Sequence, residues 1–556
     1  AYVPKKFTGV VEGLWSRSVL SHSVCAAVGR RVGMRLQAFF TQKGDHRVSL
    51  LGLDIGTTGT KACVFDEDGR LLSTGYREYP LVAPRAGWLE LDPNVVWAKV
   101  REAVGEAGDS VRNDPVDALA ISVLGEAAVP VDIAGNALDN SILGFDNRAA
   151  EIWGKWMESQ NAGELMKITG QPPSQMFTLA KLMWLREHKA QLYKKMHRYA
   201  TFEAFVQLRM GLEPKVDYAM ASRTMAFDME EKSYSKEICD SADVNPSLFC
   251  EAVPTGRVVG KLGPQASEEL SLPEGCLVCV GSHDQPAGAL GSGVTEPGIA
   301  MDATGTVECF AVAMQAPIVN RVMLDSHLAC YPHAAADRYI SLAYNFTGGS
   351  LLRWARDTFG EAERAEADRT GQDVYEMLTA EMAEEPTELL VQPHFTMAGT
   401  PYMDPDPVGG VVGLTLSTSR AEFLRSLLEG ASYEMKLNLE RFEEAGVGVE
   451  EFRATGGGAK SDLWLQLKAD MFKRPIVRLE VSEAASLGMS FVAGAASGAY
   501  GDPAEAAKEL VSTRETFEPN RDNAAFYDMM LESYRELYPA LKSWQDATEF
   551  SPGGGD

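Results

Sequence analysis

Two stretches of this chain share one order of residues: a short apolar run, an aspartate near its end, and a turn of glycine and threonine. In the first, residues 48–54 lead into Ile-Gly-Thr-Thr-Gly-Thr-Lys61, and in the second, residues 298–302 lead into Ala-Thr-Gly-Thr306. Short apolar runs that meet Gly and Thr are typical of buried strands that end in a tight turn. A chain that opens each half in this way is expected to have a duplicated α/β architecture with two lobes.

The apolar pattern predicts strands and helices in both halves. A β-meander is expected over residues 48–76, with a hairpin turn at 66–69, and an amphipathic helix over 94–109, where valines recur at helical spacing. Further strands are expected at 118–123, 127–131 and 276–280. Helices are expected at 178–210, 419–446, 460–473 and 503–549, with a close-packed internal helix at 484–501.

The length of 556 residues is too great for one typical core. We expect an extension outside the fold at 1–48, a first lobe at 49–292 and a second lobe at 293–556, with a hinge at 291–298. The extension carries eight basic and two acidic residues, which fits either an organelle transit peptide or a segment appended ahead of the fold; we favour the second. The tail 551–556 is expected to be disordered.

The net charge of −26 argues against nucleic-acid binding, because phosphate recognition relies on clustered cations. No stretch has the roughly 20 apolar residues of a membrane-spanning helix. Eight cysteines in this length form no dense framework, which favours a reducing compartment. Cys276 and Cys279 have no second pair to complete a zinc site, so we interpret them as buried strand cysteines. We therefore predict a cytoplasmic protein without nucleic-acid or membrane partners.

The first Gly/Thr turn has the composition of a phosphate-binding loop. In Asp54-Ile-Gly-Thr-Thr-Gly-Thr-Lys61, Gly56 lets backbone N–H groups approach an anion, the hydroxyls of Thr57 and Thr58 donate hydrogen bonds, and Lys61 adds a positive charge. Asp54 can hold Mg²⁺ through water. The alternative for this stretch is a purely structural hairpin.

Two further glycine loops lie in the second half. One is Ala303-Thr-Gly-Thr306, and the other is Ala454-Thr-Gly-Gly-Gly-Ala-Lys-Ser461, ahead of a helix expected to begin near Asp462. Glycines before a helix N-terminus allow a ligand to approach closely and favour anions there. The alternatives are an ordinary strand connection for the first loop and a flexible turn for the second.

These three loops and their order resemble the FGGY carbohydrate kinases, which share the actin-like nucleotide-binding fold. The likeness spans residues from about 51 to 502, and the xylulokinase branch is the most similar, particularly at 177–228 and 453–468. Further landmarks in the same order are Gly87-Trp-Leu-Glu-Leu-Asp-Pro93, Phe177-Thr-Leu-Ala-Lys-Leu182, Asp217 with Ser222 and Phe227-Asp228, Gly281-Ser-His-Asp-Gln-Pro286, Thr400-Pro-Tyr-Met-Asp-Pro405 and Gly413-Leu-Thr-Leu-Ser417.

The resemblance implies an α/β fold of two actin-like, ribonuclease H-like lobes with a catalytic cleft between them. ATP would be held mainly by the second lobe and the sugar mainly by the first. Asp284 would be the general base that takes the proton of the attacking hydroxyl. The residues agree, because Asp284 follows the apolar strand 276–280 and a loop at a strand end is expected to present it. The alternative is a helix N-cap; we interpret His283 as positional rather than catalytic.

The family position also implies a role for each loop. Thr58 and Lys61 would face the transferring phosphoryl group, and Asp54 would lie in the Mg²⁺ shell. The β- and γ-phosphates would contact Gly305 and Thr306. The nucleotide pocket would be lined by Gly349, Gly457, Gly458 and Ser461.

The sugar would meet a polar set made of Glu126, Asp146, Arg148, Asp284 and Gln285, since carboxylates accept hydrogen bonds from vicinal hydroxyls. Glu126 matches the position of a substrate-binding glutamate in glycerol kinases. The alternative for Glu126 is a solvated or internally paired carboxylate.

Several positions depart from the patterns of the better-known branches. The arginine that precedes the glutamate in glycerol kinases is Gly125 here, and their pocket tyrosine is Met176, which disfavours glycerol. The Met-His pair expected of xylulokinases is missing, and Leu143-Gly-Phe-Asp146 stands in place of their Trp-Asn-Asp. The substrate is therefore not fixed by the resemblance.

We predict an ATP- and Mg²⁺-dependent kinase that phosphorylates a free hydroxyl of a sugar or polyol, with a ketose such as a pentulose favoured. A homodimer is the default assembly. Two rival hypotheses are a catalytically silent sugar- or nucleotide-binding protein of the same fold, and an actin-like or chaperone ATPase.

Overall fold

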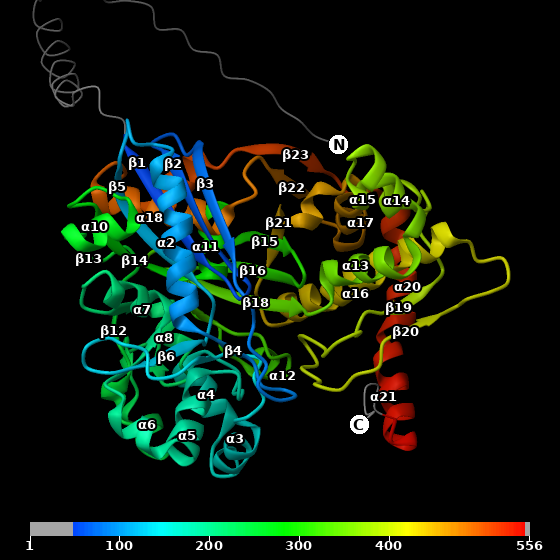
Figure 1. Ribbon diagram of the computed structural model, residues 1–556. Coiled ribbons are helices and arrows are strands. Elements are labelled where there is room, and N and C mark those ends of the chain that lie inside the picture. The colour runs from blue at the N-terminus through cyan, green and yellow to red at the C-terminus, as the bar shows by residue number, and fades with distance from the viewer. Residues whose placement is uncertain (1–47, 551–556) are drawn as a thin grey trace, which may run out of the picture. The chain divides into compact units, whose positions relative to one another are not determined.

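The computed structural model describes residues 48–550 (Figure 1). The expectations of an extension at 1–48, apart from Val48 itself, and of a disordered tail at 551–556 lie outside the described residues.

The first half of the chain forms a six-stranded sheet in the order β13-β14-β5-β1-β2-β3. Its first three strands are the predicted antiparallel meander, and β5 and β14 run parallel to β1. The strands are β1 (Ser49–Ile55), β2 (Gly59–Asp66), β3 (Leu71–Glu78), β5 (Val116–Val123), β13 (Val258–Lys261) and β14 (Leu277–His283).

The second half repeats this plan in a seven-stranded sheet of order β17-β18-β16-β15-β21-β22-β23. Here β15, β16 and β18 form the antiparallel part, and β21 and β22 run parallel to β15 and to each other. The predicted duplication is confirmed. The strands are β15 (Gly298–Thr304), β16 (Glu308–Met314), β17 (Tyr331–Pro332), β18 (Tyr339–Asn345), β21 (Val449–Thr455), β22 (Ile476–Leu479) and β23 (Thr513–Phe517).

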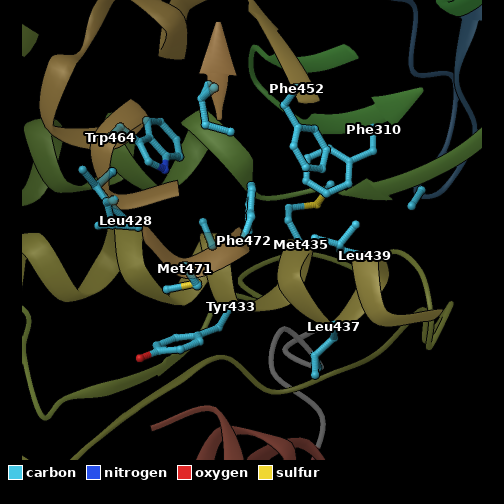
Figure 2. Close-up of a cluster of buried hydrophobic side chains, with 14 of the residues drawn as sticks. Phe310, Leu428, Tyr433, Met435, Leu437, Leu439, Phe452, Trp464, Met471 and Phe472 are labelled. Atoms are coloured by element: carbon cyan, nitrogen blue, oxygen red, sulfur yellow. The ribbon is translucent and has the colours of Figure 1, made fainter. Parts of the chain in front are cut away.

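Amphipathic helices bury the faces of both sheets. The predicted helix at 94–109 is α2 (Pro93–Asp109), which packs on β2 and β3. In the second half, α16 (Arg420–Glu444) and α17 (Asp462–Phe472) contact each other. Figure 2 shows Phe310, Phe452 and Phe472 in the buried cluster of this half, with Met435 of α16 beneath them.

A smaller sheet of order β4-β7-β6-β8 lies within the first half. The long helix predicted at 178–210 is wrong as a single element, because β8 (Arg198–Thr201) pairs with β6 (Ala128–Val131) and interrupts it. The other elements of this region are β4 (Glu90–Leu91), β7 (Ser141–Ile142), α3 (Ala150–Met157), α4 (Ala162–Thr169), α5 (Thr178–His188), α6 (Ala190–Lys195), α7 (Phe202–Arg209), β9 (Lys215–Asp217), α8 (Tyr218–Ser222), β10 (Phe227–Asp228), β11 (Ser233–Tyr234), α9 (Lys236–Ser241), η1 (Pro246–Leu248), β12 (Glu251–Val253) and α10 (Pro264–Leu270).

The helical prediction for 503–549 is also partly wrong, since β23 lies inside it and closes the edge of the second sheet. The sequence of β23 gives little indication of a strand, because Phe517 is its only apolar residue and its neighbours are polar or charged. The remaining elements are α12 (Arg321–Asp325), α13 (Gly348–Phe359), α14 (Glu361–Thr370), α15 (Val374–Ala380), β19 (Leu390–Gln392), β20 (Gly410–Val412), η2 (Gly457–Lys460), α19 (Pro503–Leu510), α20 (Arg521–Arg535) and α21 (Leu537–Thr548).

The predicted internal helix is α18 (Ala484–Ser497), and its buried face lies against β1, β5 and β14 of the first sheet and against α11 (Asp284–Gly291). Contact is close enough to require glycine: a Cβ atom on Gly52 would lie 1.8 Å from the carbonyl oxygen of Ser486. Because a helix from the second half covers the first sheet, the boundary expected between residues 292 and 293 stays a prediction.

Two expectations from composition concern the described residues. Within 48–550, no helix has both the length and the apolar character needed to cross a membrane. Cys276 and Cys279 are buried free thiols at β14, as predicted.

Candidate active site

Parallel strands bring the polar residues of the first half to one edge of its sheet. β1, β5 and β14 run in the same direction, and their carboxyl ends are followed by Gly56, Glu126 and Asp284. In open α/β sheets, ligands bind in the crevice at this edge. The strand directions therefore gather Glu126 and Asp284 beside the first Gly/Thr turn.

Asp284 is the first residue of α11 and directly follows β14. The loop expected around it is wrong, because the strand passes straight into the helix. The N-cap residue is His283, so Asp284 is not a capping aspartate either. Burial raises the pKa of Asp284 to about 7, and the negative charges of Asp54 and Glu126 add to the shift.

Side chains from neighbouring elements hold the end of β14 in place. The N–H of Gly281 donates to Glu203 over 2.6 Å, and the hydroxyl of Ser282 donates to Asp217 over 2.6 Å. Asp217 also accepts from the N–H of Met220 and so caps α8. These bonds fix the residues immediately before Asp284.

The first Gly/Thr turn is tight and presents its threonines outward. The N–H of Gly56 donates to the carbonyl of Gly59 over 2.9 Å, and the Tyr79 hydroxyl donates to the Gly56 carbonyl over 2.6 Å. Thr57 is half-buried and Thr58 is exposed. The turn is thus rigid at its backbone while both hydroxyls remain accessible.

Asp54 and Lys61 lie opposite each other in the pairing of β1 with β2. The Ser122 hydroxyl donates to Oδ1 of Asp54 over 2.7 Å, and no hydrogen bond to Oδ2 occurs among residues 48–550. Burial raises the pKa of Asp54, and the bond from Ser122 opposes that shift. Nζ of Lys61 lies 2.5 Å from Glu483, so its charge is shared with the residue that precedes α18.

Three loops of the second half meet at the carboxyl ends of β15 and β21. The N–H of Gly349 donates to the carbonyl of Gly305 over 3.0 Å, and the N–H of Ser350 donates to that of Thr306 over 3.1 Å. A Cβ atom on Gly458 would lie 2.6 Å from the side chain of Thr304. The predicted nucleotide residues of these loops are thus neighbours.

Helix N-termini complete this group of loops. Ser461 is the N-cap of α17 and accepts from the N–H of Trp464, which confirms the helix start expected near Asp462. Gly457 begins the short helix η2. The hydroxyl of Thr306 accepts a hydrogen bond from Arg353 over 2.8 Å. Together these groups give an anion both N–H donors and a nearby cation.

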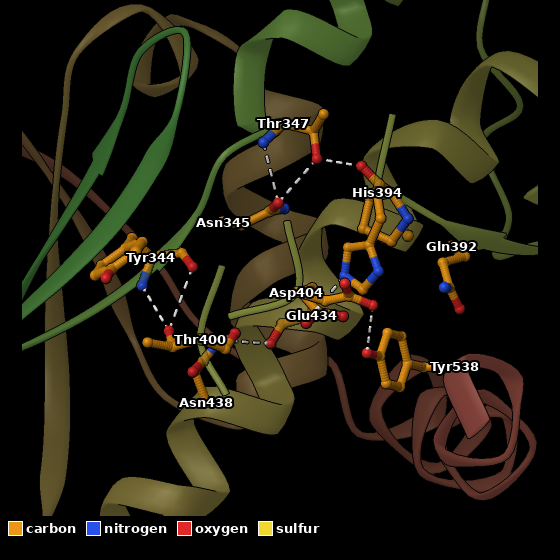
Figure 3. Close-up of polar contacts among 12 residues, drawn as sticks. Tyr344, Asn345, Thr347, Gln392, His394, Thr400, Asp404, Glu434, Asn438 and Tyr538 are labelled. Atoms are coloured by element: carbon orange, nitrogen blue, oxygen red, sulfur yellow. Dashed lines mark hydrogen bonds and ion pairs between the residues drawn. The ribbon is translucent and has the colours of Figure 1, made fainter. Parts of the chain in front are cut away.

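A buried polar network fixes the start of α13, where Gly349 lies. Asn345, at the end of β18, accepts from the N–H of Thr347 over 3.1 Å, and the Thr347 hydroxyl contacts the carbonyl of Pro393 (Figure 3). Thr400 donates to the carbonyl of Tyr344 from the other side of this strand end (Figure 3).

Glu126 is paired inside the protein. An internally paired carboxylate is one of the two alternatives to sugar binding that the sequence left open. Its carboxylate contacts Nε and Nη2 of Arg223, and Nη1 of Arg223 donates to Gln171 over 3.1 Å. Both side chains are about 8% exposed. The sequence analysis missed Arg223, whose signal is a charged residue inside the otherwise small and apolar run 219–227.

Asp146 and Arg148 form a second buried pair. Both oxygens of Asp146 accept hydrogen bonds from Arg148, and Oδ2 also accepts from the N–H of Leu89 over 2.6 Å. Arg148 stacks on Trp88 at 3.9 Å and reaches Glu90 over 2.8 Å. The oxygens expected to meet a sugar are therefore already engaged, and the sugar contact of Asp146 stays a prediction.

Arg223 borders a cavity of about 20 Å³ between segments of the two halves. Gln171 and Arg223 line it from the first half, and Tyr344 and Met403 line it from the second. This volume holds one water molecule. Gln285, whose Oε1 has no hydrogen-bond partner among the described residues, is half-buried beside Asp284.

A further buried charge cluster that the sequence analysis missed supports the second Gly/Thr turn. Nζ of Lys468, in α17, lies 2.7 Å from Asp302, 2.8 Å from the Thr304 hydroxyl and 2.7 Å from Glu308. All four side chains are buried. The cluster ties β15, β16 and α17 together immediately below the turn.

Comparison with known proteins places this geometry in one family. The profile of the FGGY family of carbohydrate kinases matches residues 49–291 with its N-terminal domain and residues 301–497 with its C-terminal domain. A xylulose kinase of Bacillus subtilis is 25% identical over 90% of this chain and 98% of its own length. A glycerol kinase of Bordetella parapertussis is 30% identical over 89% of this chain and 97% of its own.

Solved structures agree in fold. The crystal structure of a gluconate kinase from Lactobacillus acidophilus superposes with a TM-score of 0.81, at 23% identity, over 89% of this chain and 98% of that one. The two sheets, their strand order and the two family domains give the actin-like sugar kinase fold that the sequence predicted. The chain belongs to the FGGY family of carbohydrate kinases.

Proposed function

We propose that this kinase transfers the γ-phosphoryl group of ATP to a free hydroxyl of a ketose, such as a pentulose, with Asp284 as general base. The observation that carries the proposal is the place of Asp284, at the carboxyl end of a parallel strand and beside the Gly/Thr turn. A base that is ionised near neutral pH can accept the proton of the attacking hydroxyl. A pKa of about 7 for Asp284 supports that role.

The loops of the second half support a nucleotide site. Glycine forms the cradle: a Cβ atom on Gly349 would lie 2.3 Å from the carbonyl oxygen of Gly305. In this proposal Gly305 and Thr306 contact the β- and γ-phosphates, and the pocket is completed by Gly349, Gly457, Gly458 and Ser461. Alignment and charge neutralisation supply most of the rate of phosphoryl transfer.

The first turn would meet the same phosphates from the opposite side. Thr57 and Thr58 offer donors beside Gly56, and Lys61 offers a cation that Glu483 holds in place. Asp54 fits Mg²⁺ held through water, because Oδ2 is a hard oxygen left open while Ser122 orients Oδ1. When bound, the metal would neutralise phosphate charge.

The sugar side of the proposal rests on Glu126 and Gln285, with Asp284. The Glu126 carboxylate is held by Arg223, so its orientation is fixed before a ligand arrives. Relatives act on xylulose, gluconate and glycerol by their names. Gly125 and Met176 depart from the glycerol kinase pattern, which favours a longer polyhydroxylated substrate over glycerol.

The test is sugar-stimulated ADP release over a panel of ketopentoses, ketohexoses, tetritols, gluconate and glycerol, with wild type and Asp284→Asn. We expect turnover with a ketose and a loss of at least a thousandfold in Asp284→Asn. Asp228→Asn is the matched control, because Asp228 is also a half-buried aspartate but belongs to another element. This variant should keep full turnover.

Three outcomes would contradict the proposal. No sugar-stimulated turnover with retained binding would mean a catalytically silent protein, and ATP hydrolysis driven by a polypeptide would mean an ATPase. Turnover confined to gluconate or glycerol would overturn the ketose preference alone. The homodimer and the cytoplasmic location stay predictions; light scattering after gel filtration measures the first.

A further inference from the structure

His283 is the last residue of β14, directly before the candidate base, and is 4% exposed. Its Nε2 lies 3.1 Å from Oδ1 of Asp284, and its Nδ1 lies 3.0 Å from the hydroxyl oxygen of Tyr331. Tyr331 belongs to β17 in the second sheet, whereas His283 ends β14 of the first sheet and Asp284 follows it. One imidazole therefore connects the base to the opposite half of the molecule.

The room for this imidazole comes from Gly125, just before Glu126. A Cβ atom on Gly125 would lie 2.7 Å from Nε2 of His283, closer than a real side chain tolerates. The backbone of Gly125 is not left-handed, so no turn geometry demands glycine there. The ring of His283 thus explains why residue 125 is glycine here, where glycerol kinases have an arginine.

The proton positions follow from burial. Burial lowers the pKa of His283 well below its usual value, and the Arg223 guanidinium acts in the same direction, so the imidazole is neutral and carries one proton. Burial raises the pKa of Tyr331 well above its usual value, so its hydroxyl keeps its proton. If Tyr331 donates to Nδ1, the ring proton must be on Nε2, facing Asp284.

Oδ1 of Asp284 has no hydrogen-bond partner among residues 48–550, and the Gln285 side chain donates to the same carboxyl group, which opposes the rise in its pKa. At 3.1 Å the Nε2 atom is at hydrogen-bond distance from this oxygen, but the two atoms do not meet the angular requirement of a hydrogen bond in this structure. Apo geometries of catalytic hydrogen bonds are commonly loose in this way.

We propose that His283 is a positioning residue that orients the carboxylate of Asp284 by donating its Nε2 proton to Oδ1, with Tyr331 fixing the tautomer and Gly125 leaving room for the ring. This inference rests on the proposed role of Asp284. It goes beyond that role because it names a residue that orients the carboxyl group toward the attacking hydroxyl. Orientation of a reacting group governs the chemical step more than ground-state binding.

The kinetic test compares His283→Leu with His283→Gln, because the glutamine amide N–H can take the place of Nε2–H. We expect kcat to fall at least tenfold in His283→Leu with the KM values for sugar and ATP within twofold, and to recover to within about fivefold of wild type in His283→Gln. His333→Gln changes another histidine that is 4% exposed and should leave kcat unchanged.

Two variants that keep His283 guard against simple misfolding. Gly125→Ala displaces the ring and should reproduce the kcat loss of His283→Leu, and the double variant should be no worse than either single one. Tyr331→Phe should lower kcat less. A kcat within twofold of wild type in His283→Leu, or glutamine no better than leucine in a folded protein, would overturn the inference.

A second measurement does not depend on turnover. In ¹⁵N spectra of histidine-labelled protein, assigned by subtracting His283→Gln, we expect a neutral imidazole with its proton on Nε2 in wild type and a changed tautomer balance in Tyr331→Phe. A proton on Nδ1 would overturn the inference even if Asp284 were the base. Conversely, absent sugar turnover with the expected tautomer would count against the proposed function and leave the orientation of Asp284 standing.

Discussion

The surroundings of Asp284 disfavour the ionised form of its carboxyl group. Burial and the charges of Asp54 and Glu126 raise its pKa to about 7, against about 3.9 in an unfolded chain. A folded-state pKa above the unfolded value means that the native state binds more protons, so stability is lost as pH rises from about 4 to about 7. In the proposed function, Asp284 must be ionised near pH 7, and its ionised form makes the fold less stable.

The first prediction is that Asp284→Asn is more stable than wild type at alkaline pH. The amide cannot ionise, so the stability that wild type loses up to pH 7 is retained, and we expect Tm at pH 8 to rise by roughly 1–4 °C. At pH 4 the two proteins should melt within about 1 °C. Differential scanning calorimetry at both values decides, and an equal Tm at pH 8 would contradict the burial argument.

The second prediction concerns the pH dependence of the rate, whose direction is also set by the ionisation of Asp284. Only ionised Asp284 accepts a proton, so kcat/KM for the sugar should fall about tenfold per pH unit below pH 7 and level off above it. The measurement is a pH profile from 5.5 to 9 at saturating ATP. A profile flat down to pH 5.5 would show that the base titrates normally.

At the scale of elements, Lys468 joins α17 to β15 and β16 beneath the second turn. Its ammonium is the shared partner of two buried carboxylates, Asp302 and Glu308. Burial raises the pKa of Glu308 and the charge of Asp302 adds to this, while Lys468 opposes it. Removal of the cation leaves buried charge without a partner, which is strongly destabilising.

The third prediction is that Lys468→Met destabilises the protein by roughly 3–5 kcal/mol and raises the KM for ATP, because the turn loses its support. Glu308→Gln is the matched control, since it keeps the shape and removes one charge from the cluster, and should cost less. Urea unfolding and ATP kinetics measure both effects. If Lys468→Met unfolds at the same urea concentration as wild type, the cluster does not stabilise this turn.

The local sequence pattern predicted the helices and strands better than it predicted which residues contact one another. The meander from β1 to β3 and the helix α2 follow from alternating or helical apolar spacing, and both were predicted. The candidate site residues follow from residue type and order in the sequence, but their side-chain partners do not. Lys61 meets Glu483, which is distant in sequence, and nothing near Lys61 signals that contact.

The same limit explains Arg223 and His283. Their partners, Glu126 and Tyr331, come from other elements, so only the folded chain relates them. Asp284 was expected in a loop because Gly and Pro surround it. Tertiary context overrides that propensity, since α11 packs closely against α18 and the chain continues as helix.

For the molecule as a whole, the repeated strand and turn predicted two similar sheets, and the strand orders confirm it. The placement of α18 was not predictable in the same way. Its Ala, Gly and Ser residues indicate close packing on some partner, but an apolar face does not say which sheet it covers. That contact makes the two halves depend on each other.

The net charge of −26 produces a long-range electrostatic field, which affects ATP before it contacts any loop. ATP is an anion, so the field of the whole chain opposes its approach, while a neutral sugar does not feel that field. At about 0.01 M ionic strength the screening length is roughly 30 Å and the distant carboxylates count; at about 0.15 M it is roughly 8 Å and mainly nearby groups such as Arg353 remain.

The fourth prediction follows: the KM for ATP should fall two- to threefold as KCl rises from about 10 to 150 mM at constant free Mg²⁺, and the KM for a neutral sugar should stay constant. The sugar is the internal control, because a salt effect on folding or on closure would change both constants. A KM for ATP that rises with salt would mean that local cations, rather than the charge of the whole chain, govern how the nucleotide arrives.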